Sequence, residues 1–202
     1  MSDALIVIDV QNDFCPGGAL AVPDGDVIVS GVNRLMESFA TVILTQDWHP
    51  SGHSSFASSH AEKSPYDMIE MPYGPQVLWP DHCVQGTIGA AFHSDLNTDR
   101  ADLIIRKGYN AMIDSYSAFF ENDQKTPTGL EGYLRTRGID NLTMVGLATD
   151  FCVNFSAVDA ARLGFKVTVR EDLCRAIDLN GSLAVAHDGM AQAGVAVERA
   201  DG

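Results

Sequence analysis

The chain has 202 residues, of which 46% are apolar and 20% are charged, which suffices for one compact domain with a buried core. The formal net charge of −14 opposes binding to nucleic-acid phosphates or anionic membranes, because long-range repulsion would act on every encounter. We therefore expect a single domain over residues 1–202 that binds a small molecule, with neither nucleic acid nor membrane as a partner. This composition is also compatible with a homo-oligomer.

The beginning of the chain and its cysteines indicate the compartment. Residues 1–10 are too short and too acidic for a signal peptide, and no apolar stretch approaches the length that spans a bilayer. The cysteines lie far apart without a CxxC pair, so we expect reduced thiols, with Cys15, Cys83 and Cys174 structural. These features predict a cytoplasmic protein.

Six short apolar runs rich in β-branched residues are typical of buried strands: 4–10, 41–45, 103–105, 142–147, 167–169 and 195–197. Between them, apolar residues recur at helical spacing over 28–39 and 151–162, and residues 182–193 are rich in alanine. Because strands alternate with helices, the sequence predicts a mainly parallel sheet.

The segment 47–100 interrupts this alternation. It is rich in proline, glycine and histidine, holds both tryptophans and shows no sustained period. A long loop inside a compact domain is usually functional or disordered, and disordered segments are poor in aromatic residues. We therefore expect this segment to contribute to a functional site.

Reactive side chains follow four of the predicted strands. Asp9 ends the first run, Asp47 and His49 follow the second, Lys107 follows the third, and Cys152 comes shortly after the fourth. The carboxyl ends of parallel strands meet at one edge of a sheet, where ligands bind. We expect these groups to converge on one crevice.

Cys152 is the candidate nucleophile. It opens a predicted helix directly after a strand, where free amides and the helix dipole favour the thiolate. Asp9 could accept the thiol proton, and Lys107 could hold both anions by charge. The alternatives are a buried structural thiol at Cys152 and a structural ion pair between Asp9 and Lys107.

Asp47 and His49 form a candidate metal site. An extended chain places residues two apart on the same side, and further histidines follow at 53, 60 and 82. A carboxylate with imidazoles suits zinc, iron or manganese, although the DxH pattern also occurs by chance. The remaining histidines are expected on the surface: His60, His93 and His187.

Five sequence blocks together resemble the nicotinamidases of the isochorismatase-like cysteine hydrolases. The blocks are 9–20 (DVQNDFCPGGAL), 46–50 (QDWHP), 79–87 (WPDHCVQGT), 106–108 (RKG) and 146–152 (GLATDFC). They occur in the same order as in the family and extend over nearly the whole chain.

The resemblance implies an α/β fold, a three-layer αβα sandwich with a six-stranded, mainly parallel sheet. It implies a catalytic triad of Asp9, Lys107 and Cys152. It also implies one divalent metal, zinc with iron or manganese as alternatives, on the ligands Asp47, His49 and His82. Some relatives have a fourth side-chain ligand near His53 and others have water there, so His53 is an optional ligand.

The resemblance further implies how substrate would bind. A cis peptide between Leu147 and Ala148 would turn the Ala148 amide toward the site, where it forms an oxyanion hole with the Cys152 amide. The residues implied to line a pocket for an aromatic ring are Phe14, Leu20, Trp79 and Tyr116. The implied reaction hydrolyses nicotinamide to nicotinate and ammonia through a cysteine thioester, with pyrazinamide as a second substrate, in NAD salvage.

Two other functions stay open at this point. A related amidase could act on a ureido or carbamoyl substrate, but such relatives generally lack the ligands at Asp47, His49 and His82. A non-catalytic module could bind a metal or an aromatic ligand, in which case Cys152 would be structural and unreactive.

Overall fold

The computed structural model describes residues 2–199 and contains a six-stranded sheet in the order β5-β2-β1-β6-β7-β8. Every pairing in this sheet is parallel. The strands are β1 (Ser2–Ile8), β2 (Thr41–Asp47), β5 (Leu103–Lys107), β6 (Ile139–Leu147), β7 (Lys166–Arg175) and β8 (Ala196–Glu198). The predicted strands and their parallel arrangement are confirmed.

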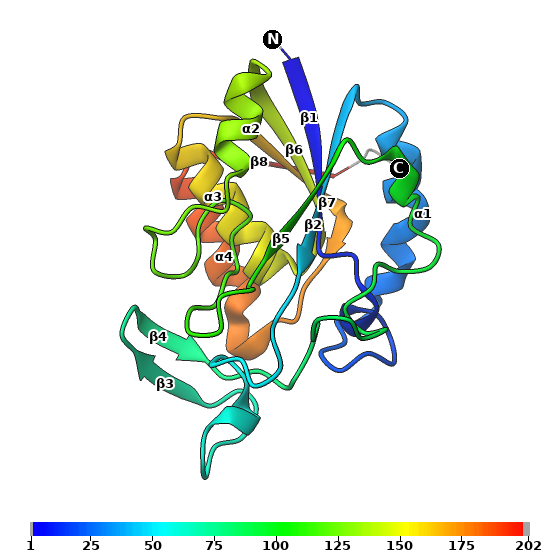
Figure 1. Ribbon diagram of the computed structural model, residues 1–202. Helices are drawn as coiled ribbons and strands as arrows, with labels where there is room; N and C mark the ends of the chain where they lie inside the picture. Colours follow the sequence, from blue (N-terminus) through cyan, green and yellow to red (C-terminus); the bar gives the residue numbers. More distant parts are fainter. Residues whose placement is uncertain (1, 200–202) are drawn as a thin grey trace.

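Four α-helices cover the sheet: α1 (Val29–Met36), α2 (Leu130–Thr136), α3 (Asn154–Arg162) and α4 (Ser182–Gln192). Figure 1 shows α1 on one face of the sheet and the other three on the opposite face. The three-layer αβα architecture expected from the resemblance is therefore confirmed. The sequence did not predict α2, a helix of only seven residues with Gly132 inside it.

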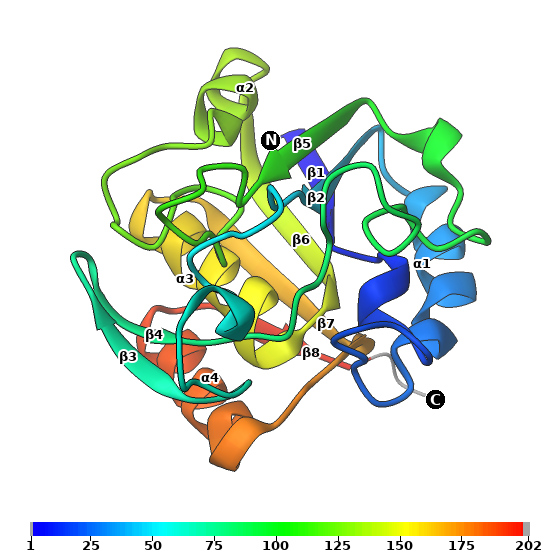
Figure 2. The ribbon, with the colours of Figure 1, turned by 60° about the horizontal axis from the view of Figure 1, so that its bottom comes forward.

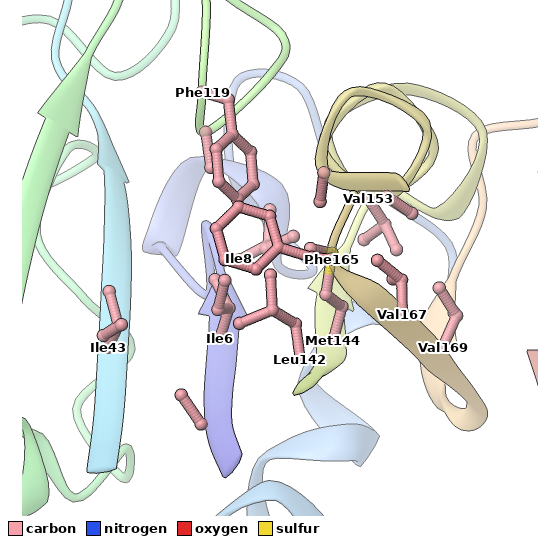
Figure 3. Packing of buried hydrophobic residues seen from close by; sticks show 14 of the residues in the cluster. Ile6, Ile8, Ile43, Phe119, Leu142, Met144, Val153, Phe165, Val167 and Val169 are labelled. Carbon is pink, nitrogen blue, oxygen red and sulfur yellow. The ribbon is translucent and has the colours of Figure 1, made fainter. Parts of the chain in front are cut away.

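Each central strand is buried on both faces, so its side chains pack against helices on both sides of the sheet. In β1, Ala4, Ile6 and Ile8 join the core beneath α2, α3 and α4, whereas Leu5 and Val7 join the core beneath α1. Figure 3 shows Ile6 and Ile8 in the first of these cores, together with side chains of β6 and β7. Burial on alternate faces explains the continuous apolar runs.

The long segment after β2 contains a hairpin of β3 (Met68–Met71) and β4 (Gly74–Val77), between two short 3-10 helices. The sequence did not predict it, because most of its residues are partly exposed and show no alternating apolar pattern. In Figures 1 and 2 the hairpin projects beyond the carboxyl ends of the strands, near α3 and α4. This edge of the sheet carries the reactive residues.

Strand register sets the relative heights of those residues. Asp47 pairs with Lys107 across β2 and β5, and Ile8, just before Asp9, pairs with Gly146 of β6.

No α-helix within residues 2–199 has both the length and the apolar character that crossing a membrane requires.

Candidate active site

The structure brings Asp9, Lys107 and Cys152 together at the carboxyl edge of the sheet. Lys107 Nζ lies 2.9 Å from Asp9 Oδ2 and 3.5 Å from Cys152 Sγ. The Cys152 thiol donates a hydrogen bond to the Asp9 carboxylate, which raises the pKa of the thiol. All three side chains are buried, so each charge is stabilised by its partners rather than by water.

Lys107 is held as a fixed cation. Its ammonium contacts three oxygens: Asp9 Oδ2 at 2.9 Å, Asp47 Oδ1 at 3.1 Å and the Ser115 carbonyl at 2.9 Å. Burial opposes the charge, but the carboxylates of Asp47 and Asp9 hold the pKa of Lys107 well above its usual value. Since its three protons are all engaged, Lys107 supplies charge and position rather than a mobile proton.

Asp9 has the properties of a proton acceptor. Burial raises its pKa above the usual 3.8, and the nearby charge of Lys107 offsets this only in part. The Thr45 hydroxyl donates to Asp9 Oδ1 at 2.6 Å and fixes the orientation of the carboxyl. A raised pKa brings the carboxyl closer to the range in which a general base works at neutral pH.

Cys152 differs from the sequence expectation in two respects. It lies inside a π-helical turn, Thr149–Val153, that precedes α3, rather than at the first position of an α-helix. Burial raises the pKa of its thiol well above 9.0, and Lys107 opposes that increase. The thiol is therefore less acidic than its position after a strand suggests, and its proton needs a base, the role expected for Asp9.

The second part of the site consists of Asp47, His49 and His82. Their donor atoms all lie within 4.8 Å of one another, and all three residues are buried. Asp47 Oδ2 lies 2.9 Å from His49 Nε2 and 3.4 Å from His82 Nε2. This carboxylate and two imidazoles are a donor set that suits a divalent metal.

The histidine rings are oriented for metal binding by backbone carbonyls. His49 Nδ1 lies 2.8 Å from the Gly108 carbonyl, and His82 Nδ1 lies 2.8 Å from the Pro80 carbonyl. Each carbonyl can accept the Nδ1 proton, so each ring directs Nε2 toward Asp47, as a lone pair when the ring is neutral and as an N–H when it is protonated. Lone pairs that face a carboxylate oxygen need a cation between them, and the site therefore fits a bound metal.

The balance of charge supports the same conclusion. The buried carboxylates of Asp9, Asp47 and Asp114 lie around Lys107 and His49. The single ammonium of Lys107 does not neutralise all three carboxylates, and a divalent cation would offset the remaining negative charge. Although burial acts to raise it, His49 and Lys107 hold the pKa of Asp47 well below its usual value, so this ligand stays ionised.

His53 and His60 occupy different surroundings. His53 is buried beside His49, with ring centroids 4.4 Å apart, but its Nδ1 lies 2.8 Å from Ser55 Oγ and its Nε2 2.8 Å from the Asn110 carbonyl. It belongs to a second group of donor atoms, with His49 and Asp114, rather than to the group around Asp47. His60 contacts the Ser54 carbonyl and belongs to neither group.

A cavity of about 330 Å³ joins the two parts of the site. Its wall includes Asp47, His82 and Cys152, together with the four residues expected to surround an aromatic ring: Phe14, Leu20, Trp79 and Tyr116. Trp79 Nε1 donates to the Tyr116 hydroxyl at 3.0 Å, which fixes two of these walls. The aromatic and aliphatic side chains of this wall lie next to the Cys152 thiol, an arrangement that suits a flat apolar ring.

Comparison with known proteins identifies the family. The model of the isochorismatase domain matches residues 3–201. The chain is 56% identical over 192 residues to a nicotinamidase of Acinetobacter baylyi, a match that covers 95% of this chain and 90% of the relative. This chain belongs to the isochorismatase family.

Solved structures agree with that assignment. A nicotinamidase/pyrazinamidase of Acinetobacter baumanii superposes with a TM-score of 0.97 at 57% identity, over 98% of this chain and 96% of the other. A pyrazinamidase of Pyrococcus horikoshii in complex with zinc gives a TM-score of 0.78 at 35% identity, over 98% and 99% of the two chains.

The nucleophile turn of this isochorismatase-family chain begins with a cis peptide between Leu147 and Ala148, as the resemblance implied. Ala148 lines the cavity next to Cys152, and its carbonyl accepts hydrogen bonds from the amides of Phe151 and Val153. The turn therefore places the backbone of Ala148 beside the thiol, where an acyl group would react.

Sequence reasoning did not identify three residues of the cavity wall: Asp114, Phe151 and Ile177. It also missed Gln11, whose side chain accepts a hydrogen bond from the Asp47 amide at 2.8 Å and donates to the Asp47 carbonyl at 2.9 Å. Gln11 is buried and lies directly after β1 and Asp9. The signal that could have found Gln11 is its place inside the first family block, two residues after Asp9.

Proposed function

We propose that this chain is a nicotinamidase, which hydrolyses nicotinamide to nicotinate and ammonia and also accepts pyrazinamide. The observation that carries the proposal is one cavity lined by aromatic side chains, with a buried Asp9–Lys107–Cys152 cluster and the donors Asp47, His49 and His82 in or behind its wall. The relatives named nicotinamidase and pyrazinamidase support this substrate class. The product nicotinate places the reaction in NAD salvage.

The chemistry follows from the arrangement of the three catalytic groups. Asp9 accepts the proton of the Cys152 thiol, and the sulfur attacks the carboxamide carbon of the substrate. The amides of Ala148 and Cys152 stabilise the oxyanion. Asp9 then returns the proton to the departing amine, so ammonia leaves and a thioester remains on Cys152.

The second half of the reaction needs one water molecule. Asp9, ionised again after ammonia leaves, accepts a proton from water as the water oxygen attacks the thioester carbon. The carbon–sulfur bond breaks, nicotinate forms, and the proton returns to the thiol through Asp9. Lys107 keeps its three oxygen contacts and stabilises the negative charge of Asp9 and the sulfur.

Asp47, His49 and His82 would hold the metal, which we propose to be zinc because carboxylate and imidazole donors suit it, with iron and manganese as alternatives. The zinc complex of the Pyrococcus horikoshii pyrazinamidase supports this choice. When bound, the metal would supply a Lewis acid for the ring nitrogen of the substrate. We treat His53 as a residue that supports His49 through ring contact.

We further propose that residues 1–202 form one hydrolase domain that acts in the cytoplasm on a small aromatic amide. The family match over residues 3–201 supports the single domain. The net charge of −14 disfavours anionic macromolecular partners.

An ammonia-release assay on a panel of amides tests the proposed function. The panel contains nicotinamide, pyrazinamide, benzamide and a carbamoyl amino acid, each with intact protein, with chelated protein and after metal is restored. We expect release from the two ring-nitrogen amides, loss on chelation and recovery with a divalent metal. Release only from the carbamoyl compound would favour the ureido amidase, and no release from any amide would favour a binding module.

A further inference from the structure

Asp150 is a buried carboxylate that the proposed chemistry does not use. It lies in the nucleophile turn two residues before Cys152 and is 3% exposed. Its carboxylate accepts three hydrogen bonds from the connection between β7 and α4: the Ile177 amide at 3.0 Å, the Asp178 amide at 2.7 Å and the Ser182 hydroxyl at 2.5 Å. One side chain therefore ties this loop to the turn that carries the nucleophile.

The loop has a conformation that needs such an anchor. Asp178, Asn180 and Gly181 have φ values of 54°, 53° and 84°, in the left-handed region. Non-glycine residues adopt this region at a cost and keep it only where surrounding groups enforce it. Successive amides that converge on one carboxylate, as those of residues 177 and 178 do, are a common way to enforce such a turn.

The loop reaches the substrate cavity through Ile177. Its side chain lines the same cavity as Cys152, Leu20 and Phe151, and it packs with the core beneath α1. Because the Ile177 amide bonds directly to Asp150, the position of this wall depends on the nucleophile turn. A displacement of the loop would widen the cavity on the side of Ile177 without moving the metal ligands.

We propose that Asp150 is a positioning residue that sets substrate specificity by holding Ile177 against the ring of the bound amide. This inference rests on the proposed nicotinamidase function and names the part of the wall that limits ring size. The Asp150 oxygens accept hydrogen bonds from loop groups rather than from the reacting cluster, so its role is placement and not proton transfer.

The test compares the variants Asp150→Asn, Ser182→Ala and Ile177→Ala with the parent enzyme. The probes are nicotinamide, its derivatives methylated at each ring carbon, and quinoline-3-carboxamide. Asparagine keeps the shape of Asp150 but places an amide NH₂ against groups that need an acceptor. We expect Asp150→Asn and Ile177→Ala to raise KM for nicotinamide more than they lower kcat.

The decisive readout is relative specificity. We expect the same substituted amide to gain about tenfold in kcat/KM relative to nicotinamide in both variants, as a lost wall contact of one or two methyl groups would produce. Ser182→Ala should shift specificity in the same direction by less. In the double variant Asp150→Asn/Ile177→Ala, the change in relative specificity should be less than the two single changes combined, because both substitutions act on the same contact.

Asp102→Asn is the matched control, because the Asp102 carboxylate accepts a hydrogen bond from the Val42 amide at the opposite edge of the sheet. It should leave specificity unchanged. If Asp150→Asn does not fold, Ile177→Ala and Ser182→Ala still decide the matter by whether they favour the same amide. Unchanged specificity, different favoured amides or additive effects would overturn the inference, whereas a parent enzyme inactive on nicotinamide would overturn the proposed function itself.

Discussion

The site has two parts that are held in different ways. Asp9, Asp47 and Lys107 lie at or just after strand ends, where parallel register fixes their heights to one another. His82, Trp79 and the pocket walls lie on long connections, and each is positioned by side-chain or carbonyl contacts rather than by the sheet. The strand-held part supplies Asp9 and Lys107 of the catalytic cluster and the metal ligand Asp47, whereas the loop-held part shapes the substrate pocket.

Two residues link the catalytic cluster to the rest of the site. Lys107 contacts Asp9 on one side and Asp47 on the other, so the catalytic carboxylate and the metal carboxylate share one cation. Asp150 links the nucleophile turn to the loop of Ile177. Substitutions of Asp9 or Cys152 should therefore remove turnover, whereas substitutions of the metal ligands or of the pocket walls should change metal or substrate binding.

Cys152→Ala should have the largest effect. Removal of the nucleophile should lower kcat by about a thousandfold or more, because the thioester route disappears while the metal ligands stay in place. Ammonia release and metal content measure the two consequences. Cys174→Ala is the control, since Cys174 is also a buried free cysteine but does not line the cavity. Activity above about a tenth of the parent in Cys152→Ala would be incompatible with covalent catalysis.

Asp9→Asn should lower kcat by roughly a hundredfold to ten-thousandfold, since an amide cannot accept the thiol proton. Metal content and substrate binding should persist. In the parent, kcat/KM should rise with pH as Asp9 loses its proton, and this limb should be centred above 3.8 because burial raises the Asp9 pKa. It should fall again at high pH, where the proton shared with Cys152 is lost, which gives a bell-shaped profile.

A near-parent rate in Asp9→Asn would place the general base elsewhere. If Asp9→Asn instead loses most of its turnover and its residual kcat/KM no longer rises with pH on the acid side, the acid limb of the parent belongs to the cluster containing Asp9. The pH profile of kcat/KM with nicotinamide distinguishes these outcomes.

The strand-held residues could be predicted from the sequence because each directly follows an apolar run, and parallel strands end at a common edge. His82 could not be selected over His60 by spacing alone; only the family motif indicated it. Asp114 and Ile177 lie in irregular connections whose path depends on tertiary contacts, so no local pattern marks them. The low acidity of the Cys152 thiol could not be predicted from the sequence, because it depends on burial, which outweighs the favourable charge of Lys107.

His49→Ala and His82→Ala should each remove most of the bound metal and weaken nicotinamide binding by about ten- to a hundredfold, because each ring supplies one ligand atom. His60→Ala is the control, since its ring contacts the Ser54 carbonyl outside both donor groups. Metal analysis of the purified proteins provides the readout. A full metal complement in His82→Ala would transfer the third ligand position to His53.

Gly108→Ala should have a smaller effect of the same kind. Its φ is 68°, and a Cβ would lie 2.6 Å from His49 Cε1 and 2.9 Å from Asp47 Oδ1, so the added methyl group would displace both ligands. We expect metal affinity to fall by about tenfold, as for other groups that orient a ligand. Gly138→Ala shares the left-handed backbone, with φ 65°, but meets no atom within 4 Å and should retain full affinity.

Equal metal affinity in the two glycine variants would show that the Gly108 carbonyl and its surroundings do not position His49. Thermal unfolding should show a loss of stability in both variants from the disfavoured φ, and a larger loss in Gly108→Ala because its Cβ also displaces buried side chains.

The central claim is that one cavity joins the Cys152 thiol to a metal on Asp47, His49 and His82. Its most direct test is a crystal structure of the metal-loaded Cys152→Ala variant with nicotinamide, in which anomalous scattering locates the metal. We predict the metal on Asp47, His49 and His82, the ring between Phe14, Trp79 and Ile177, and the carboxamide against residue 152. A metal on His49, His53 and Asp114, or a carboxamide directed away from residue 152, would contradict it.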